Sequence, residues 1–331
     1  MRTLIVTLAA AVALVGCGRN EEQQPSAPQG RVAHQSFSGG SNSDLLFRRN
    51  DGAVAIWTVA NGAKSGDAML SAAEGWTIQA AGDFNGDGKA DLLWRNAEGL
   101  LGVWTMDGVT VTARESLAGA AQEWQILGVG DFDGDRKDDI LWRNANGQVA
   151  IWTMNGATVA NRGVVGGAGA EWRLRAIADF NGDGRDELIW RRDDNLLVRW
   201  EMQGAEISAS GGVPSAPDSW SIVGAADFNG DGKADLLWRG ADGATAVWTM
   251  DGANVVSRDS SQGAAGWVVT DIGDFNGDGR ADILWRDDQG RISAWMMNAA
   301  TREGAASFGQ VSSEWQIVSS VVREAAPQLR R

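Results

Sequence analysis

The stretch that decides the fold is residues 83–95, which read DFNGDGKADLLWR. Four further stretches repeat it almost letter for letter: DFDGDRKDDILWR from Asp131, DFNGDGRDELIWR from Asp179, DFNGDGKADLLWR from Asp227 and DFNGDGRADILWR from Asp274. A sixth, degenerate copy, SFSGGSNSDLLFR, begins at Ser36. Successive copies start 47 or 48 residues apart, a period typical of propellers and other repeat arrays. We therefore expect an array built from one repeated unit.

Each unit contains four short apolar segments separated by turn signals, as in an antiparallel meander. In one unit these segments are residues 124–129, 140–143, 148–154 and a weaker 158–161, with the acidic loop between the first two. Glycine, or Asn195 in one unit, stands four residues after the arginine that ends the second segment. Both residue types tolerate the positive φ of a tight turn. The pattern predicts an all-β protein of four-stranded antiparallel blades.

The ends of the array indicate how it closes. It begins in a second strand, residues 44–47, and ends in a first strand, residues 315–322, so six first and six second strands are present. Blades in a ring bury both faces against their neighbours, and runs such as LLW, ILW and AVW are apolar on both sides. A straight solenoid would need polar capping repeats, and none is evident. The sequence predicts a six-bladed β-propeller, closed by pairing the C-terminal strand with the N-terminal blade.

The acidic half of the motif predicts a site for a hard cation. Oxygen-bearing side chains stand at positions 1, 3, 5 and 9 of the loop. Calcium takes six to eight oxygen ligands, and a tight loop supplies alternate side chains together with a backbone carbonyl at position 7. Glycine at position 6 permits a sharp turn, and phenylalanine at position 2 is expected to anchor the loop in the core. The absence of glutamate at position 12 separates this loop from an EF-hand.

These motifs resemble the FG-GAP or VCBS repeats, which are calcium-binding propeller blades also found in integrin α-subunit heads. The resemblance covers about residues 36–322. It implies about five structural calcium ions, held by positions 1, 3, 5, 7 (through the backbone) and 9 of each loop. In this sequence the implied ligands are Asp83, Asn85, Asp87, Lys89 and Asp91; Asp131, Asp133, Asp135, Lys137 and Asp139; Asp179, Asn181, Asp183, Arg185 and Glu187; Asp227, Asn229, Asp231, Lys233 and Asp235; and Asp274, Asn276, Asp278, Arg280 and Asp282.

Two of these loops depart from the shared pattern. Arg136 replaces glycine at position 6, which is expected to strain that loop, while Asp133 adds a charge at position 3. Glu187 replaces the final aspartate, and its longer side chain is expected to alter the coordination geometry. A metal-free alternative for all five loops is a set of acidic Asx-turns, although carboxylates clustered without a cation repel one another.

The degenerate copy is expected to bind no metal. Ser36, Ser38 and Gly40 stand where the other loops carry carboxylates or amides, and only Asp44 remains. At the seam of the ring the first and second strands come from opposite ends of the chain, so no loop is needed to join them. We therefore expect five metal sites in six blades. Because the same loop recurs in five blades without an evident open position for a substrate, the expected role of calcium is to stabilise the fold.

Residues 1–16 have the pattern of a secretory signal, with an apolar run at 4–15 that is too short to span a bilayer as a stable helix. The sequence Leu14-Val15-Gly16-Cys17 resembles the lipobox of bacterial lipoproteins, which implies cleavage before Cys17 and lipidation of that cysteine. Glycine rather than aspartate follows it, which implies the outer membrane, on its periplasmic or its external side. An ordinary signal peptide with a chance cysteine is the alternative.

The rest of the chain divides simply. Residues 17–35 are expected to be the lipidated cysteine and a flexible tether, residues 36–323 the propeller, and residues 324–331 a C-terminal tail. Cys17 is the only cysteine, so no intramolecular disulfide is possible. The only histidine, His34, lies in the tether, which excludes a histidine base inside the propeller.

The net negative charge of the chain comes mainly from the repeated acidic loops. The net charge is -14, yet 16 of the 43 acidic residues lie at the repeated loop positions, and the remaining 27 nearly balance 29 Lys and Arg. No basic stripe is available to neutralise phosphates, which speaks against nucleic-acid binding.

The tryptophans and one set of arginines recur at fixed places. All seventeen tryptophans fall into three columns: Trp76, Trp124, Trp172, Trp220, Trp267 and Trp315; Trp94, Trp142, Trp190, Trp238 and Trp285; and Trp57, Trp104, Trp152, Trp200, Trp248 and Trp295. We expect packing between blades, with stacking on sugars as the alternative for a column near the surface. The arginines that end the second strands are Arg48, Arg95, Arg143, Arg191, Arg239 and Arg286.

Because strand connections alternate ends, these arginines are expected on the face opposite the acidic loops. They are predicted either to bind a carboxylate or an acidic glycan or to pair with backbone carbonyls of the next blade. The functional hypothesis is a monomeric, non-catalytic, membrane-anchored recognition module that binds glycan or protein at the cell envelope. Similar repeats form fungal lectins. The alternatives are an envelope scaffold for outer-membrane assembly and a polysaccharide-acting enzyme, for which residues 191–201 are the only asymmetric candidate.

Overall fold

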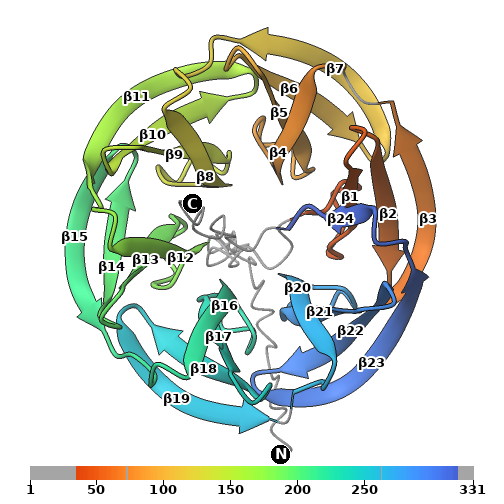
Figure 1. Cartoon of the computed structure of the whole chain (residues 1–331), viewed down its shortest axis with the longest axis vertical. Coiled ribbons are helices and arrows are strands. Elements are labelled where there is room, and N and C mark those ends of the chain that lie inside the picture. Colours follow the sequence, from red (N-terminus) through yellow and green to blue (C-terminus); the bar gives the residue numbers. More distant parts are fainter. Residues whose placement is uncertain (1–34, 72–73, 262, 320–331) are drawn as a thin grey trace, which may run out of the picture.

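A computed structural model describes residues 35–71, 74–261 and 263–319 of the protein. These residues form six four-stranded sheets arranged as blades around a central axis (Figure 1). All the regular elements among them are β-strands, paired antiparallel throughout. No helix in this part of the chain is long and apolar enough to cross a membrane. The signal segment, Cys17 and most of the tether lie outside the described residues, as does the C-terminal tail.

Each blade is a meander that runs from the axis outward. The innermost strands are β4 (Trp76–Gly82), β8 (Trp124–Gly130), β12 (Trp172–Ala178), β16 (Trp220–Ala226), β20 (Trp267–Gly273) and β24 (Trp315–Ile317). The second strands are β1 (Leu45–Arg49), β5 (Asp91–Asn96), β9 (Asp139–Asn144), β13 (Glu187–Arg192), β17 (Asp235–Gly240) and β21 (Asp282–Asp287). The predicted repeat of four segments therefore corresponds to one blade.

The outer half of each blade completes the sheet. The third strands are β2 (Val54–Ala60), β6 (Leu101–Asp107), β10 (Gln148–Asn155), β14 (Leu197–Gln203), β18 (Thr245–Asp251) and β22 (Arg291–Asn298). The outermost strands are β3 (Ala63–Leu70), β7 (Thr110–Leu117), β11 (Thr158–Gly167), β15 (Glu206–Val213), β19 (Asn254–Ser261) and β23 (Thr301–Gln310). The weak fourth segment expected at 158–161 is thus a ten-residue strand, because an outer edge strand exposes alternate side chains and shows no continuous apolar run.

The ring closes as predicted. One sheet has the order β24-β1-β2-β3, so the last strand pairs antiparallel with the first, with Phe47 opposite Ile317 and Arg48 opposite Gln316. We number this blade one; blades two to six follow as β4–β7, β8–β11, β12–β15, β16–β19 and β20–β23. Closure joins the two ends of the array by main-chain hydrogen bonds, which leaves no exposed edge at the seam.

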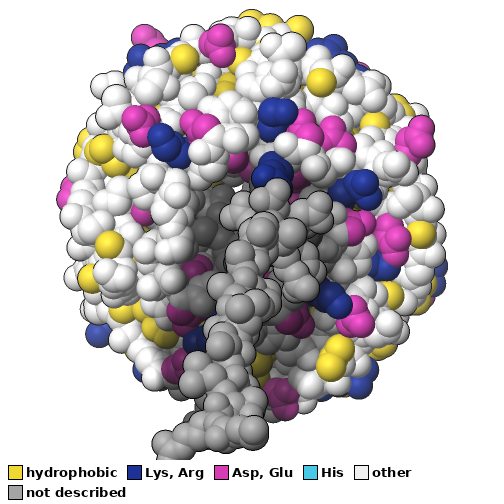
Figure 2. All heavy atoms as spheres, turned by 180° about the vertical axis from the view of Figure 1, so that it is seen from behind, with side chains coloured by type: hydrophobic (Ala, Val, Ile, Leu, Met, Phe, Trp, Pro, Cys, Tyr) yellow, Lys and Arg dark blue, Asp and Glu magenta, His cyan; other side chains and the backbone are white. Residues whose placement is uncertain are grey.

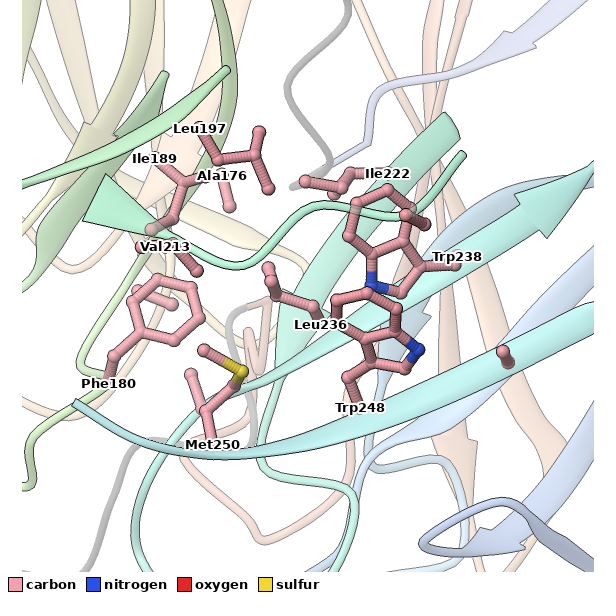
Figure 3. Packing of buried hydrophobic residues seen from close by; sticks show 14 residues of the cluster. Ala176, Phe180, Ile189, Leu197, Val213, Ile222, Leu236, Trp238, Trp248 and Met250 are labelled. Carbon is pink, nitrogen blue, oxygen red and sulfur yellow. The ribbon is translucent and has the colours of Figure 1, made fainter. Parts of the chain in front are cut away.

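The core lies between neighbouring blades. The cluster between blades four and five brings Ile189 and Leu197 of one blade against Leu236 and Trp238 of the next (Figure 3). The second column of tryptophans is fully buried in every blade that has it, with Phe47 in the remaining place. The phenylalanines at loop position 2 are also fully buried. The predicted packing of this column and the predicted anchoring of the loops are both confirmed.

Candidate calcium loops and ligand faces

The loop of blade five shows the geometry that the acidic loops share. Asp227, at position 1, accepts hydrogen bonds from the amide of Gly230 at Oδ1 (2.6 Å) and from that of Gly232 at Oδ2 (2.7 Å). Both glycines have positive φ, 79° and 85°, a region that glycine enters without steric cost. The loop therefore wraps around its first carboxylate. The same pattern recurs in the loops that begin at Asp83, Asp131, Asp179 and Asp274.

The carboxylate at position 9 ties the loop to the third strand. Asp235 is fully buried; its Oδ1 accepts a hydrogen bond from the Met250 amide (2.9 Å) and its Oδ2 one from the Phe228 amide (3.1 Å). In the degenerate loop of blade one, Asp44 keeps the equivalent bonds to Val59 and Phe37. Position 9 therefore organises the blade even where the other carboxylates have been lost.

Burial makes these carboxyl groups hard to ionise. At position 9, burial raises the pKa of Asp91, Asp235 and Asp282 to about 7. It raises the pKa of Asp139 and Glu187 to about 8. The neighbouring loop carboxylates add to the effect. A nearby cation favours the charged form of a carboxyl and lowers its pKa. Each loop is therefore an anionic site that a bound cation would stabilise.

The chemistry and spacing of these oxygens fit calcium. Two sets of carboxylates place one oxygen each within 4.8 Å of one another: Asp131, Asp133 and Asp139 in blade three, and Asp179, Asp183 and Glu187 in blade four. In blade two, Oδ2 of Asp91 is buried and accepts no hydrogen bond. Hard oxygen donors gathered in a flexible loop are the ligands that calcium prefers. The assignment of positions 1, 3, 5, 7 and 9 as ligands remains a prediction for all five loops.

The loops also join the blades into a ring. The amide at loop position 8 donates to the carbonyl at position 1 of the preceding blade at every one of the six joints, over 2.6–2.8 Å. The carbonyl of the phenylalanine at position 2 accepts a hydrogen bond from the third-to-fourth turn of the next blade, as between Phe180 and Gly252 (2.8 Å). We call the side of the disc that carries these loops and turns the loop face. The sequence predicted that the acidic loops lie together on one face, opposite the arginines. It did not predict the continuous ring of hydrogen bonds between them.

At three joints a side chain reinforces this ring. The position 8 side chain accepts a hydrogen bond from the amide at position 1 of the preceding blade, from Asp83 to Asp138 (2.6 Å), from Asp131 to Asp186 (2.9 Å) and from Asp274 to Ser43 (3.1 Å). A Cβ at Gly82 would lie 2.6 Å from Oδ2 of Asp138, so the close approach requires glycine there. In the sequence, Asp138 and Asp186 are indistinguishable from additional ligand candidates.

Comparison with protein families matches this chain to the FG-GAP-like repeat over residues 131–190, 179–238 and 227–285, and to the FG-GAP repeat over residues 75–104. These segments together cover more than half of the chain and carry all five complete loops. The protein is an FG-GAP-repeat β-propeller. No curated protein matches it in sequence.

Two solved structures are similar to this FG-GAP propeller at low identity. The Cps50 (Swd1) β-propeller domain of Myceliophteria thermophila shares 12% identity at a TM-score of 0.49, over 85% of this chain and 88% of its own. Raptor from Chaetomium thermophilum shares 10% identity at a TM-score of 0.46, over 86% of this chain and 27% of its own.

The two departures in the loops are visible in the structure. Arg136 adopts a φ of 69°, the left-handed conformation that its neighbours reach with glycine, which confirms the expected strain. Glu187 accepts hydrogen bonds from the Phe180 amide at Oε2 (2.6 Å) and from Asn181 Nδ2 at Oε1 (2.5 Å). Its Oε1 also lies 3.6 Å from Nη1 of Arg199, a charged neighbour that the other loops do not have at this strand position.

The repeated arginines lie on the opposite side of the disc, as predicted, and we call this the arginine face. Five of the six donate to the main-chain carbonyl of the first tryptophan of the next blade: Arg95, Arg143, Arg191, Arg239 and Arg286, over 2.6–3.2 Å. Arg143 also donates to the carbonyls of Ala168 (2.7 Å) and Gly169 (2.5 Å). Of the two predicted roles, this geometry favours pairing with the next blade. Arg48 donates instead to Oε1 of Gln316, at 3.3 Å.

The three tryptophan columns differ in exposure. The second is fully buried, whereas all six members of the first column are half-buried; they begin the innermost strands, at the arginine face. In the third column, arginines of the outer strand lie over the indole rings, with Arg114, Arg162 and Arg258 at 4.4, 4.0 and 4.7 Å from the centroids. Sequence reasoning missed these arginines, although each stands ten residues after its tryptophan and directly opposite it in the sheet.

The centre of the propeller contains a cavity of about 460 Å³. It is lined by small and aliphatic residues of the innermost strands, such as Ala80 and Ile177, together with charged residues: Arg48, Arg175, Asp138 and Asp186. Around the rim, acidic and basic side chains are interspersed on the side of the disc shown in Figure 2. Neither charge forms one extended patch on the coloured atoms visible in this view.

Proposed function

We propose that this FG-GAP propeller is a non-catalytic, calcium-stabilised recognition module that is held at the bacterial cell envelope by a lipid on Cys17 and binds a glycan or a protein. The observation that carries the proposal is the ring of half-buried first-column tryptophans on the arginine face. The loops and five of the repeated arginines form hydrogen bonds between blades, whereas these indoles remain partly exposed to solvent. Indole faces stack on sugar rings and are common anchors at protein interfaces.

Calcium supports this role by holding the scaffold. In each complete loop, the side chains at positions 1, 3, 5 and 9 and the carbonyl at position 7 would hold the ion. When bound, calcium supplies the positive charge that the buried carboxylates need in order to be ionised. The residues themselves position the first and second strands of a blade and fasten them to the preceding blade.

A glycan array in calcium tests the recognition role. We expect saturable binding by the wild-type protein and its loss when Trp124 and Trp220, both in the first column, are replaced together by alanine. The matched control is Trp200→Ala, which removes a half-buried tryptophan from the third column and should leave binding intact. Absence of glycan binding, together with co-purification of an outer-membrane protein, would favour the scaffold function instead.

The anchor is tested separately. Metabolic labelling with an alkyne-tagged fatty acid should modify the wild-type protein and fail to modify Cys17→Ser. In cell fractionation, the Cys17→Ser variant should be absent from the membrane fraction, because stable association of the protein with the membrane requires acyl chains. Equal membrane association of both proteins would contradict the lipid anchor.

A further inference from the structure

Blade four differs from the other blades at three positions that lie close together. Its third strand carries Arg199 where the others carry an aliphatic side chain: Ile56, Val103, Ile151, Val247 and Ala294. Its loop ends in Glu187 where every other blade has aspartate. After the third-column tryptophan it carries Glu201, where the others have Thr58, Thr105, Thr153, Thr249 and Met296. All three changes introduce or lengthen a charged group.

The three side chains contact one another inside the blade. Arg199 is only 8% exposed and Glu187 only 1%. Nη1 of Arg199 lies 3.6 Å from Oε1 of Glu187, and Nη2 donates a hydrogen bond to Oε1 of Glu201. Nη1 is itself buried and makes no hydrogen bond. A buried guanidinium stays charged, so this arrangement is a fixed positive charge held against the ninth-position carboxylate of the loop.

The comparison with blade five shows what the arginine changes. There Asp235 accepts a hydrogen bond from the Met250 amide on the third strand, and the position of Arg199 on that strand is taken by the uncharged Val247. In blade four Glu187 instead bonds Asn181 and faces Arg199. The oxygens of Asp179, Asp183 and Glu187 still gather within 4.8 Å, so their spacing is compatible with an ion. The difference lies in the charge beside them.

We infer that Arg199 supplies in loop four much of the positive charge that a metal supplies in the other loops, so that the propeller binds four calcium ions tightly and a fifth, in loop four, only weakly. The inference rests on the proposed calcium binding of the other four loops. Calcium affinity depends on the net charge of the ligands, and a guanidinium a few ångströms from Glu187 repels the incoming ion. Glu201 binds the other nitrogen of Arg199 and leaves Nη1 directed at Glu187. We expect loop four to bind calcium at least about tenfold more weakly than the others.

Native mass spectrometry and calorimetric titration with calcium test the stoichiometry. At calcium concentrations that just saturate the tight sites, the wild-type chain should bind four ions. The triple variant Glu187→Asp, Arg199→Val, Glu201→Thr gives blade four the residues of blade five and should bind five. The reciprocal control, Asp235→Glu, Val247→Arg, Thr249→Glu, should bind three. If the reciprocal variant fails to fold, the restoring variant still decides the question.

The outcomes separate this inference from the function on which it rests. Five ions bound by the wild type, or four by the restoring variant, would overturn the role of Arg199 while leaving calcium binding intact. No calcium bound by the wild type would overturn the proposed function itself. Hydrogen exchange identifies the loop directly: adding a chelator should speed exchange at 227–235 and leave 179–187 unchanged. Equal loss of protection in both loops would also overturn the inference.

Discussion

Neighbouring blades are fastened on both faces of the disc, and the two faces use different chemistry. On the loop face, backbone amides donate to backbone carbonyls at all six joints, around carboxylates whose charge is costly to bury. On the arginine face, guanidinium groups donate to carbonyls of the next blade, as from Arg95 to Trp124 (2.6 Å). Five of the six arginine joints are made by the protein's own donors and acceptors. The loop joints lie beside carboxylates that require a cation or a proton.

This difference predicts which face responds to solution conditions. Metal and pH should act on the loop face, because its charged groups are buried carboxyls with raised pKa values. The arginine face should be insensitive to both, because guanidinium keeps its charge at every accessible pH. The following experiments test that division, from the largest expected effect to the smallest.

Removal of calcium should have the largest effect. At free calcium tenfold above Kd, each site contributes about 1.4 kcal/mol, so four sites contribute about 5–6 kcal/mol. Thermal unfolding followed by tryptophan fluorescence should therefore show a Tm lower by roughly 10 °C in chelator, restored when calcium is added back in excess. An unchanged Tm would mean that the loops stabilise the fold without metal, as acidic Asx-turns.

The arginine face is tested by Arg143→Ala. The change removes the donors to the carbonyls of Trp172, Ala168 and Gly169 and should lower the free energy of unfolding by about 2–4 kcal/mol. The loss should be the same in calcium and in chelator. The control Arg162→Ala removes an exposed arginine that lies over Trp152 and should cost no more than about 1 kcal/mol. A calcium-dependent loss in Arg143→Ala would show that the two faces are coupled.

The pH dependence of the metal-free protein should have an unusual sign. Burial raises the pKa of Asp235 to about 7 and that of Asp139 to about 8, above the value of about 4 in an unfolded chain. Between these values the folded state holds more protons than the unfolded state, so stability falls as pH rises. In chelator, Tm should therefore decrease as the pH rises from 5 to 8. In saturating calcium the slope should disappear, and a slope that persists unchanged would place its origin outside the loops.

The number of blades, the closure of the ring and the two faces could be predicted from the sequence, because the repeat unit recurs at a regular spacing. The period and the unequal ends of the array predicted six blades and the closure that pairs Phe47 with Ile317. The division into two faces follows from alternating connections. Contacts between blades are harder to predict. In the sequence Asp138 resembles a metal ligand, but in the structure its carboxylate accepts a hydrogen bond from the Asp83 amide of the neighbouring blade. The pairing of Arg199 with Glu187 was likewise hidden, since it depends on which strand residues face the loop.

The smallest effect concerns backbone strain, and here the two faces respond in opposite directions to the same substitution. On the loop face Arg136 has a φ of 69° where the other complete loops have glycine, so Arg136→Gly should stabilise the protein by about 1 kcal/mol. On the arginine face Asn195 has a φ of 74°, but its Oδ1 accepts from Arg191 Nε and its Nδ2 donates to the Ala216 carbonyl, each at 2.5 Å.

Asn195→Gly removes these two hydrogen bonds and a third, which Ser215 Oγ donates to Oδ1 (3.0 Å). The conformational relief is small, because asparagine already tolerates this region. That variant should therefore be destabilised, by about 1–2 kcal/mol. Urea unfolding of the two variants in calcium measures both changes against the wild type. If both glycine variants were stabilised, the asparagine would be a backbone substitute only, and the arginine face would depend on side-chain hydrogen bonds less than its geometry indicates.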